Sequence, residues 1–168
     1  MGRQVVLRDL NIKGNSDTAY KASNGKYYSS QEAYEKIVAE QEYRSDCIKL
    51  MYNLLDYDSF MKLPTIFYKK LKEWEPFTYR VVLKCINNKA SSVDWALNNK
   101  SFNSEVAKMM YICAILDNGM VDALKEVRKE DRKKAREVAE NKSEQVNNVA
   151  IANPIQQTKN ISRWLEDD

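Results

Sequence analysis

Residues 103–127 read NSEVAKMMYICAILDNGMVDALKEV, and their apolar side chains recur with the period of an α-helix. Steps of three and four residues place these side chains on one helical face. The stripe consists of Val106, Met110, Cys113, Leu116, Met120, Leu124 and Val127. Asn118-Gly119 lies within it and could end a helix, because glycine adopts the left-handed C-cap conformation cheaply. The stripe keeps its phase across this dipeptide, so we predict one helix with a weak point.

Signals for other helices precede this stretch. The predicted starts are Ser29, Pro64, Pro76 and Ser91. Ser29 and Glu32 have the spacing of a capping box and predict an amphipathic helix that runs to about Leu55. A proline suits the first turn of a helix because its missing amide hydrogen would be unpaired there. Ser91 with Asp94 predicts a short fourth helix.

The N-terminal residues 1–28 form an arm outside these helices. Val5-Val6-Leu7 indicates one short strand, and Asn24-Gly25 is a strong turn signal. Lys26-Tyr27-Tyr28 is then compatible with the returning strand of a small hairpin.

Residues 141–160 are rich in Asn, Gln, Ser and small side chains and contain Pro154, a composition typical of a linker. The chain therefore divides into the arm (1–28), a helical domain with a projecting last helix (29–140), and a polar linker with a terminal motif (141–168). The predicted fold class is mostly α, a compact multi-helix bundle with an irregular N-terminal arm and a flexible C-terminal tail.

The composition argues against catalysis and against a cofactor. The 168 residues include no histidine, which removes the commonest general base and most zinc sites. Glycine-rich phosphate loops are also missing, so we expect no catalytic residue, no metal site and no cofactor.

The three cysteines, Cys47, Cys85 and Cys113, are odd in number and lie in apolar helical settings. They predict buried, reduced thiols in the cytoplasm. No apolar stretch is long enough to cross a membrane.

A net charge of +3 predicts that any nucleic-acid site would be local. The segment 67–74 interleaves aromatic and basic side chains, as nucleic-acid-binding segments do. Its candidate phosphate-binding residues are Lys69, Lys70 and Lys72. The favoured interpretation is an ordinary amphipathic helix, with Phe67, Leu71 and Trp74 inward and the lysines in solvent.

A second basic segment spans residues 125–142. Its candidate nucleic-acid-binding residues are Arg132, Lys133, Lys134 and Arg136. Acidic residues alternate with the basic ones, which favours a solvated helix over a nucleic-acid-binding arm.

The terminal octapeptide holds a concentrated apolar group. Ile161, Trp164 and Leu165 have the i, i+3, i+4 spacing that places them on one face of a helical turn. Short motifs after linkers often dock as helices in a partner's groove, and tryptophan is a frequent interface anchor. The alternative, that this turn folds back on its own domain, accounts for the pattern equally well.

Two segments carry a resemblance to known proteins. Residues 24–34, NGKYYSSQEAY, and residues 61–74, from Met61-Lys62-Leu63-Pro64-Thr65 through Trp74, resemble small accessory proteins of bacteriophages and prophages of Gram-positive bacteria. The Lys, Asn, Ile and Tyr bias is similar to that of their AT-rich genomes. The resemblance implies a protein that acts on host or phage machinery inside a bacterial cell, and it transfers no site residue.

The sequence as a whole predicts a non-catalytic adaptor or inhibitor that binds a protein partner, with the terminal turn as one contact. The alternative is a nucleic-acid-binding accessory protein of phage replication or regulation, which would use the basic segments.

Overall fold

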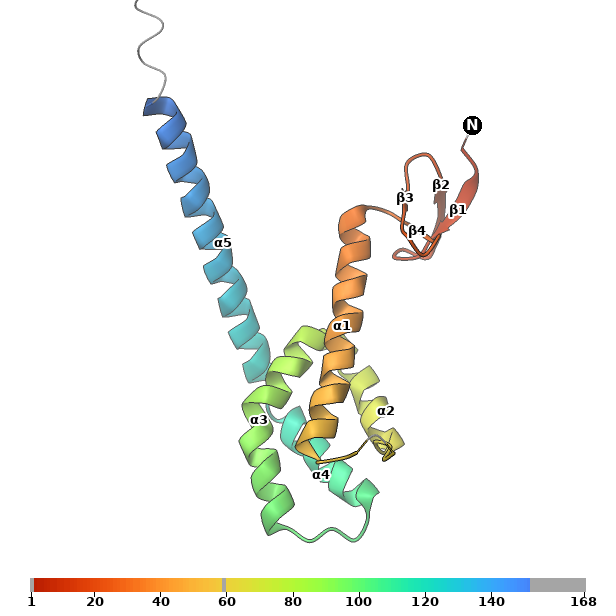
Figure 1. Ribbon diagram of the computed structural model, residues 1–168, viewed down its shortest axis with the longest axis vertical. Helices are drawn as coiled ribbons and strands as arrows, with labels where there is room; N and C mark the ends of the chain where they lie inside the picture. Colours follow the sequence, from red (N-terminus) through yellow and green to blue (C-terminus); the bar gives the residue numbers. More distant parts are fainter. Residues whose placement is uncertain (1, 59, 152–168) are drawn as a thin grey trace, which may run out of the picture. The chain divides into compact units, whose positions relative to one another are not determined.

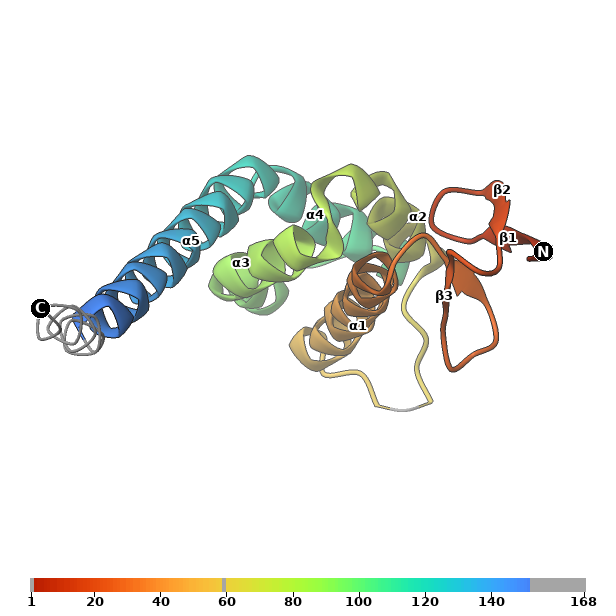
Figure 2. The same cartoon turned by 90° about the horizontal axis from the view of Figure 1, so that it is seen from above.

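The computed structural model describes residues 2–58 and 60–151, with side chains as far as residue 141. The described chain is mostly α-helical, with one small sheet near its N-terminus (Figures 1 and 2). This confirms the predicted fold class. The chain divides into two units after Leu124.

Four short strands form a sheet in the order β2-β1-β4-β3. The strands are β1 (Gln4–Leu7), β2 (Ile12–Asn15), β3 (Tyr20–Lys21) and β4 (Tyr27–Tyr28). The β1–β2 and β3–β4 pairs are antiparallel, whereas β1 and β4 are parallel. The predicted hairpin is confirmed, because β3 and β4 flank a turn in which Gly25 has a φ of 76°. Strand β2 is not evident from the sequence, since its four residues include Gly14, and glycine is depleted in strands.

Helix α1 (Gln31–Leu54) begins later than predicted. Its N-cap is Ser30, whose hydroxyl accepts a hydrogen bond from the Ala33 N–H over 3.1 Å. The sequence pattern assigns the cap to Ser29, but the Ser29 N–H donates to the Asp9 carboxylate over 2.9 Å, and its hydroxyl donates to the same group. The predicted capping box is therefore wrong by one residue, because Ser29 is bound to the turn after β1.

Three tyrosine rings join the sheet to α1. The ring of Tyr34 in α1 has its centroid 5.0 Å from that of Tyr28 and 5.7 Å from that of Tyr20. Tilted aromatic pairs at these distances attract each other in addition to burying area. With the Asp9–Ser29 hydrogen bonds, the rings hold the sheet at the N-terminal end of the helix.

Helices α2 (Thr65–Glu73) and α3 (Tyr79–Asn99) follow, joined by the short 3-10 helix η1 (Glu75–Phe77). Neither Pro64 nor Pro76 lies in the first turn of an α-helix, where the sequence predicted both prolines. Pro64 occupies the N-cap position of α2, and Pro76 lies in η1 ahead of α3.

The predicted short fourth helix is wrong, because Ser91 and Asp94 lie within α3. Helix α3 has buried residues on both sides of its polar middle, residues 87–92, and these two packed ends hold the polar stretch in one helix. The buried residues are Val81, Val82, Cys85, Ile86, Val93 and Ala96. Ser91 is exposed and caps no helix.

The predicted long helix is two helices, α4 (Glu105–Asp117) and α5 (Met120–Ile151), separated by Asn118-Gly119. The Gly119 N–H donates to the Leu116 carbonyl over 2.8 Å, which closes a turn. A Cβ atom on Gly119 would lie 2.9 Å from the Cys85 Sγ. The helix therefore breaks where the chain passes too close to α3 for a side chain to fit.

Helix α5 also runs beyond the expected boundary at residue 141. Its backbone stays helical to Ile151, so the first part of the predicted linker is helix. The segment has few strong helix breakers, since asparagine and serine are only modestly unfavourable in helices. Pro154 and the rest of the linker lie outside the described residues.

The core lies where α3 packs on α1 and α4, and where α2 packs on α4 (Figure 1). Its largest fully buried side chains are Phe67, Met51, Leu71, Ile86, Met109, Ile112 and Leu116. Cys47, Cys85 and Cys113 are buried and unpaired, as predicted. Burial raises the pKa of these thiols to about 12, 11 and 12, respectively.

Part of the predicted stripe is wrong in α4. Val106 and Met110 are 52% and 57% exposed, while Met109 and Ile112 are fully buried in their place. Most residues of α4 are apolar, so two overlapping stripes satisfy the helical period. The contacts with α2 and α3 select between them.

Substitution by alanine distinguishes the two stripes. We expect Leu116→Ala to lower the free energy of unfolding by about 2–5 kcal/mol, because it opens a cavity in the core. The matched variant Met110→Ala should cost less than about 0.5 kcal/mol, since that side chain is mostly in solvent. Chemical denaturation measures the free energy of unfolding of both variants. Similar losses for the two would show that the buried face of α4 has been assigned incorrectly.

Candidate functional site

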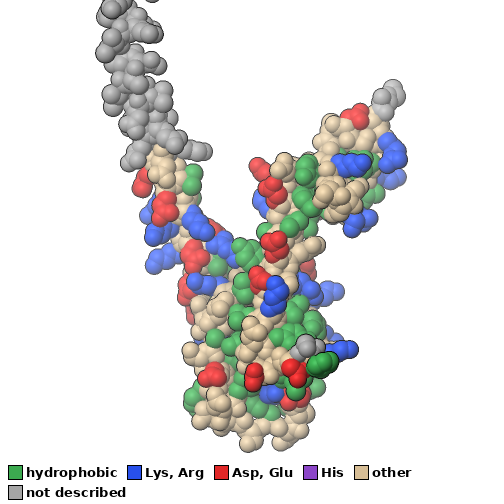
Figure 3. Space-filling model, viewed as in Figure 1, with side chains coloured by type: hydrophobic (Ala, Val, Ile, Leu, Met, Phe, Trp, Pro, Cys, Tyr) green, Lys and Arg blue, Asp and Glu red, His purple; other side chains and the backbone are tan. Residues whose placement is uncertain are grey.

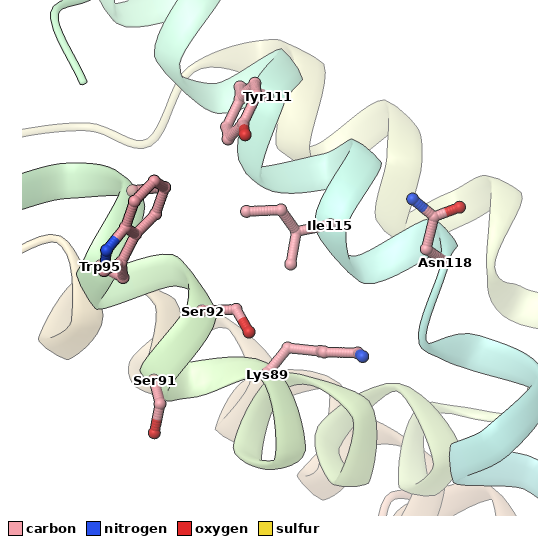
Figure 4. Close-up of a pocket in the computed structure, with 8 residues that line it drawn as sticks. Lys89, Ser91, Ser92, Trp95, Tyr111, Ile115 and Asn118 are labelled. Carbon is pink, nitrogen blue, oxygen red and sulfur yellow. The ribbon is translucent and has the colours of Figure 1, made fainter. Parts of the chain in front are cut away.

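A groove with a volume of about 490 Å3 lies on the surface where α3 and α4 meet. Trp95 on α3 and Tyr111 on α4 stand on its two sides, and Ile115 projects between the helices (Figure 4). The full lining consists of Lys89, Ser91, Ser92, Trp95, Ala96, Tyr111, Ile115 and Asn118. The groove therefore joins aromatic and aliphatic surface with a few polar groups, as ligand-binding grooves commonly do.

Trp95 is exposed because of its place on α3. The neighbouring residues Val93 and Ala96 are fully buried, and the helical rotation between them turns Trp95 outward. The side chain remains 57% exposed, an unusual setting for the residue with the largest apolar surface.

Lys100 lies close to both exposed rings. Its Nζ lies 4.8 Å from the centroid of the Tyr111 ring and 6.0 Å from that of Trp95. The ring of Phe102 packs against Tyr111 at a centroid distance of 5.7 Å. Cation–π contacts at exposed sites contribute about 0.5–1 kcal/mol each, enough to favour one arrangement of the rings.

The charge of the groove favours an anionic ligand group. Of the lining side chains only Lys89 is charged, and Ser91 and Ser92 supply hydroxyl groups. Lys100 adds a second positive charge beside the rings. A ligand that combines an apolar side chain with a carboxylate would complement both parts.

A second hollow, with a volume of about 430 Å3, lies beside Tyr57, Glu105 and Lys108. The Tyr57 hydroxyl donates to the Glu105 carboxylate, and the Lys108 Nζ lies 2.7 Å from the same carboxylate. The hydrogen bond from Lys108 lowers the pKa of Glu105, and burial raises the pKa of Tyr57. The contacts of Glu105 with Tyr57 and Lys108 tie the α1–α2 loop to α4.

The sequence-predicted partner-binding residues, Ile161, Trp164 and Leu165, lie outside the described residues. Partner binding by these three residues stays a prediction.

The lysines predicted on α2 have different surroundings. Lys69 and Lys72 are exposed, whereas Lys70 forms ion pairs of 3.0 Å with Glu73 and 3.1 Å with Asp117. Of the aromatic side chains in this segment, only Tyr68 is exposed, and its ring packs on Phe67 at a centroid distance of 6.0 Å. Phe67 and Trp74 are buried, and the Trp74 Nε1–H donates to Asp117 over 2.6 Å. The predicted burial of Phe67, Leu71 and Trp74 is confirmed, whereas Lys70 is ion-paired and half-buried. Nucleic-acid binding by the lysines stays a prediction.

The predicted basic residues of α5 all lie in solvent. Arg132, Lys133, Lys134 and Arg136 are exposed, and the Lys133 Nζ lies 3.8 Å from the Glu137 carboxylate. The interleaved charges follow the pattern expected of a solvated helix.

Sequence reasoning did not find the groove. One signal was present, because Trp95 lies off the stripe that contains Val93 and Ala96, and an aromatic side chain off the buried face merits attention. The pairing with Tyr111 could not be inferred, since it depends on how α3 and α4 pack.

Two tryptophans provide a matched test of this geometry. We expect Trp95→Ala to lower the free energy of unfolding by about 1 kcal/mol or less, because the ring is largely in solvent. Trp74→Ala should cost about 3–5 kcal/mol, because it removes a buried ring and leaves the Asp117 carboxylate without that donor. Thermal or chemical unfolding of both variants is the measurement. A large loss for Trp95→Ala would show that its ring belongs to the core.

Within the part of the chain that the structure describes, no helix is long and apolar enough to cross a membrane. The same residues contain no cluster of three or more His, Cys, Asp or Glu side chains that could hold a metal ion. Comparison with known proteins finds no matching family model, curated protein or solved structure, so the function has to be inferred from the site itself.

Proposed function

We propose that this chain is a non-catalytic adaptor or inhibitor that binds a protein partner in the groove between α3 and α4. The observation that carries the proposal is the exposed Trp95, which faces Tyr111 across the groove (Figure 4). The Lys100 Nζ lies within 6.0 Å of both ring centroids. Tryptophan, tyrosine and cationic side chains dominate the binding energy of many interfaces, and exposed clusters of them are uncommon elsewhere.

The partner segment should carry an aromatic or branched aliphatic side chain next to an acidic residue. The apolar side chain would fill the space between Trp95 and Ile115, and the acid would meet Lys89. The lining offers no carboxylate, histidine or cysteine that could act as a general base or nucleophile, which favours binding over catalysis. The resemblance to phage accessory proteins points to host or phage machinery as the source of the partner.

The test uses the purified chain and a partner captured from bacterial cells and then purified. Calorimetry should show that Trp95→Ala weakens binding at least about tenfold, equivalent to about 1.4 kcal/mol. Phe60→Ala is the matched control, because Phe60 is also aromatic and is 92% exposed on the loop after α1. Its dissociation constant should change by less than about twofold, as expected of a residue outside the interface.

Two results would contradict the proposal. Unchanged affinity of Trp95→Ala would remove the groove from the interface, and equal losses for both variants would indicate unspecific aromatic contact. The variant Trp164→Ala, in the same assay, tests the terminal motif separately. If it alone loses affinity, the contact is the terminal turn and the groove proposal fails.

A further inference from the structure

The net charge of the chain is concentrated in its N-terminal sheet. Residues 1–28 contain five of the 27 basic residues but only two of the 24 acidic ones, which leaves 22 of each in the remaining residues. The whole excess of +3 therefore belongs to the sheet and its turns. Figure 3 shows Lys and Arg side chains gathered on this part of the molecule.

The five basic side chains of the sheet are all exposed. They are Arg3, Arg8, Lys13, Lys21 and Lys26. Within the described residues, no ion pair joins any of them to a carboxylate. Elsewhere in the bundle, by contrast, lysines such as Lys70 and Lys108 are paired with acidic residues.

The two acidic residues of the sheet accept hydrogen bonds from their own neighbours. Asp9 accepts from the N–H and the hydroxyl of Ser29, and Asp17 accepts from the Ser16 hydroxyl over 3.3 Å. These contacts fix both carboxylates at the turns. The basic side chains are therefore free to contact an external anion.

The pairing of β1 with β2 arranges a polar face for such an anion. Val6 pairs with Lys13 and Gln4 pairs with Asn15, so these four side chains share one face of the ribbon. A hollow with a volume of about 370 Å3 lies on this ribbon, lined by Gly2, Gln4, Lys13, Gly14 and Asn15. Its lining offers one cation and two side-chain amides and contains no acid, which suits a phosphate group.

We propose that this ribbon binds the phosphate backbone of double-stranded DNA, with Lys13 in the hollow and Arg8 on the turn that follows β1. Single-stranded nucleic acid is bound largely by stacking on free aromatic rings. Two of the three tyrosines of the sheet, Tyr20 and Tyr28, pack on Tyr34, and the ring of the third, the half-buried Tyr27, has the Lys21 Nζ 6.0 Å from its centroid. Contacts to phosphates position a protein on a duplex without reading its sequence, so binding should be unspecific in sequence.

The experiment measures fluorescence anisotropy of a labelled duplex of about 20 base pairs with the full chain at several salt concentrations. The double variant Arg8→Gln/Lys13→Gln should weaken binding at least about tenfold at low salt. Each phosphate contact contributes about 0.9 to the salt dependence of the logarithm of the affinity, so the slope should fall by about 2. Both side chains are exposed, so circular dichroism and the melting temperature should match those of the unmodified chain.

The matched control is Lys69→Gln/Lys72→Gln, which removes the same charge from two exposed lysines of α2. It should change the DNA affinity less than about twofold, and Trp95→Ala should leave it unchanged. Equal losses for the two double variants would overturn the proposal, because binding would then follow net charge alone. Tighter binding of single strands, binding of anionic lipid vesicles without DNA, or no binding at low salt would overturn it as well.

Discussion

Cys85 of α3 lies against the turn between α4 and α5, where its thiol donates to the Leu116 carbonyl over 3.3 Å. Gly119 makes this approach feasible, because the space that a Cβ atom would need is already occupied by the Cys85 Sγ and the Lys89 side chain. Both Cys85 and Leu116 are fully buried. The contact fixes which faces of α3 and α4 meet, and close-packed interiors leave little freedom to rotate either helix afterwards.

The exposed surfaces of the bundle follow from this constraint. With the Cys85 face inside, helical geometry places Val93 and Ala96 in the core and leaves Trp95 outside, opposite Tyr111. The groove therefore results from the packing of α3 against α4. Two aromatic rings line it, and Lys100 lies close to both. The sheet offers a different chemistry, since it carries the net positive charge of the chain. An adaptor that joins a protein to DNA would need both kinds of surface.

The parts of the fold that depend on local signals were predictable from sequence, and the parts that depend on packing were not. Helical periodicity and turn residues indicated α1, α2, the hairpin and the buried thiols, but not the full length of α3 or the break between α4 and α5. The cap of α1 shifted to Ser30 because Asp9, distant in sequence, binds Ser29. The buried face of α4 was ambiguous because two apolar stripes overlap, and contacts with α2 and α3 decide between them. The groove was not predicted, because it exists only once α3 and α4 are paired.

Thermal unfolding of Gly119→Ala tests the contact between α3 and the α4–α5 turn most directly. The φ of Gly119 is not positive, so the reduced entropy of the unfolded chain alone predicts that alanine stabilises the protein by about 0.4–1 kcal/mol. The close contact predicts the opposite, a loss of about 1–3 kcal/mol, because the added Cβ atom would lie 2.9 Å from the buried Cys85 Sγ. A lower melting temperature for Gly119→Ala would support this account of the bundle. A melting temperature equal to or above that of the unmodified chain would contradict it.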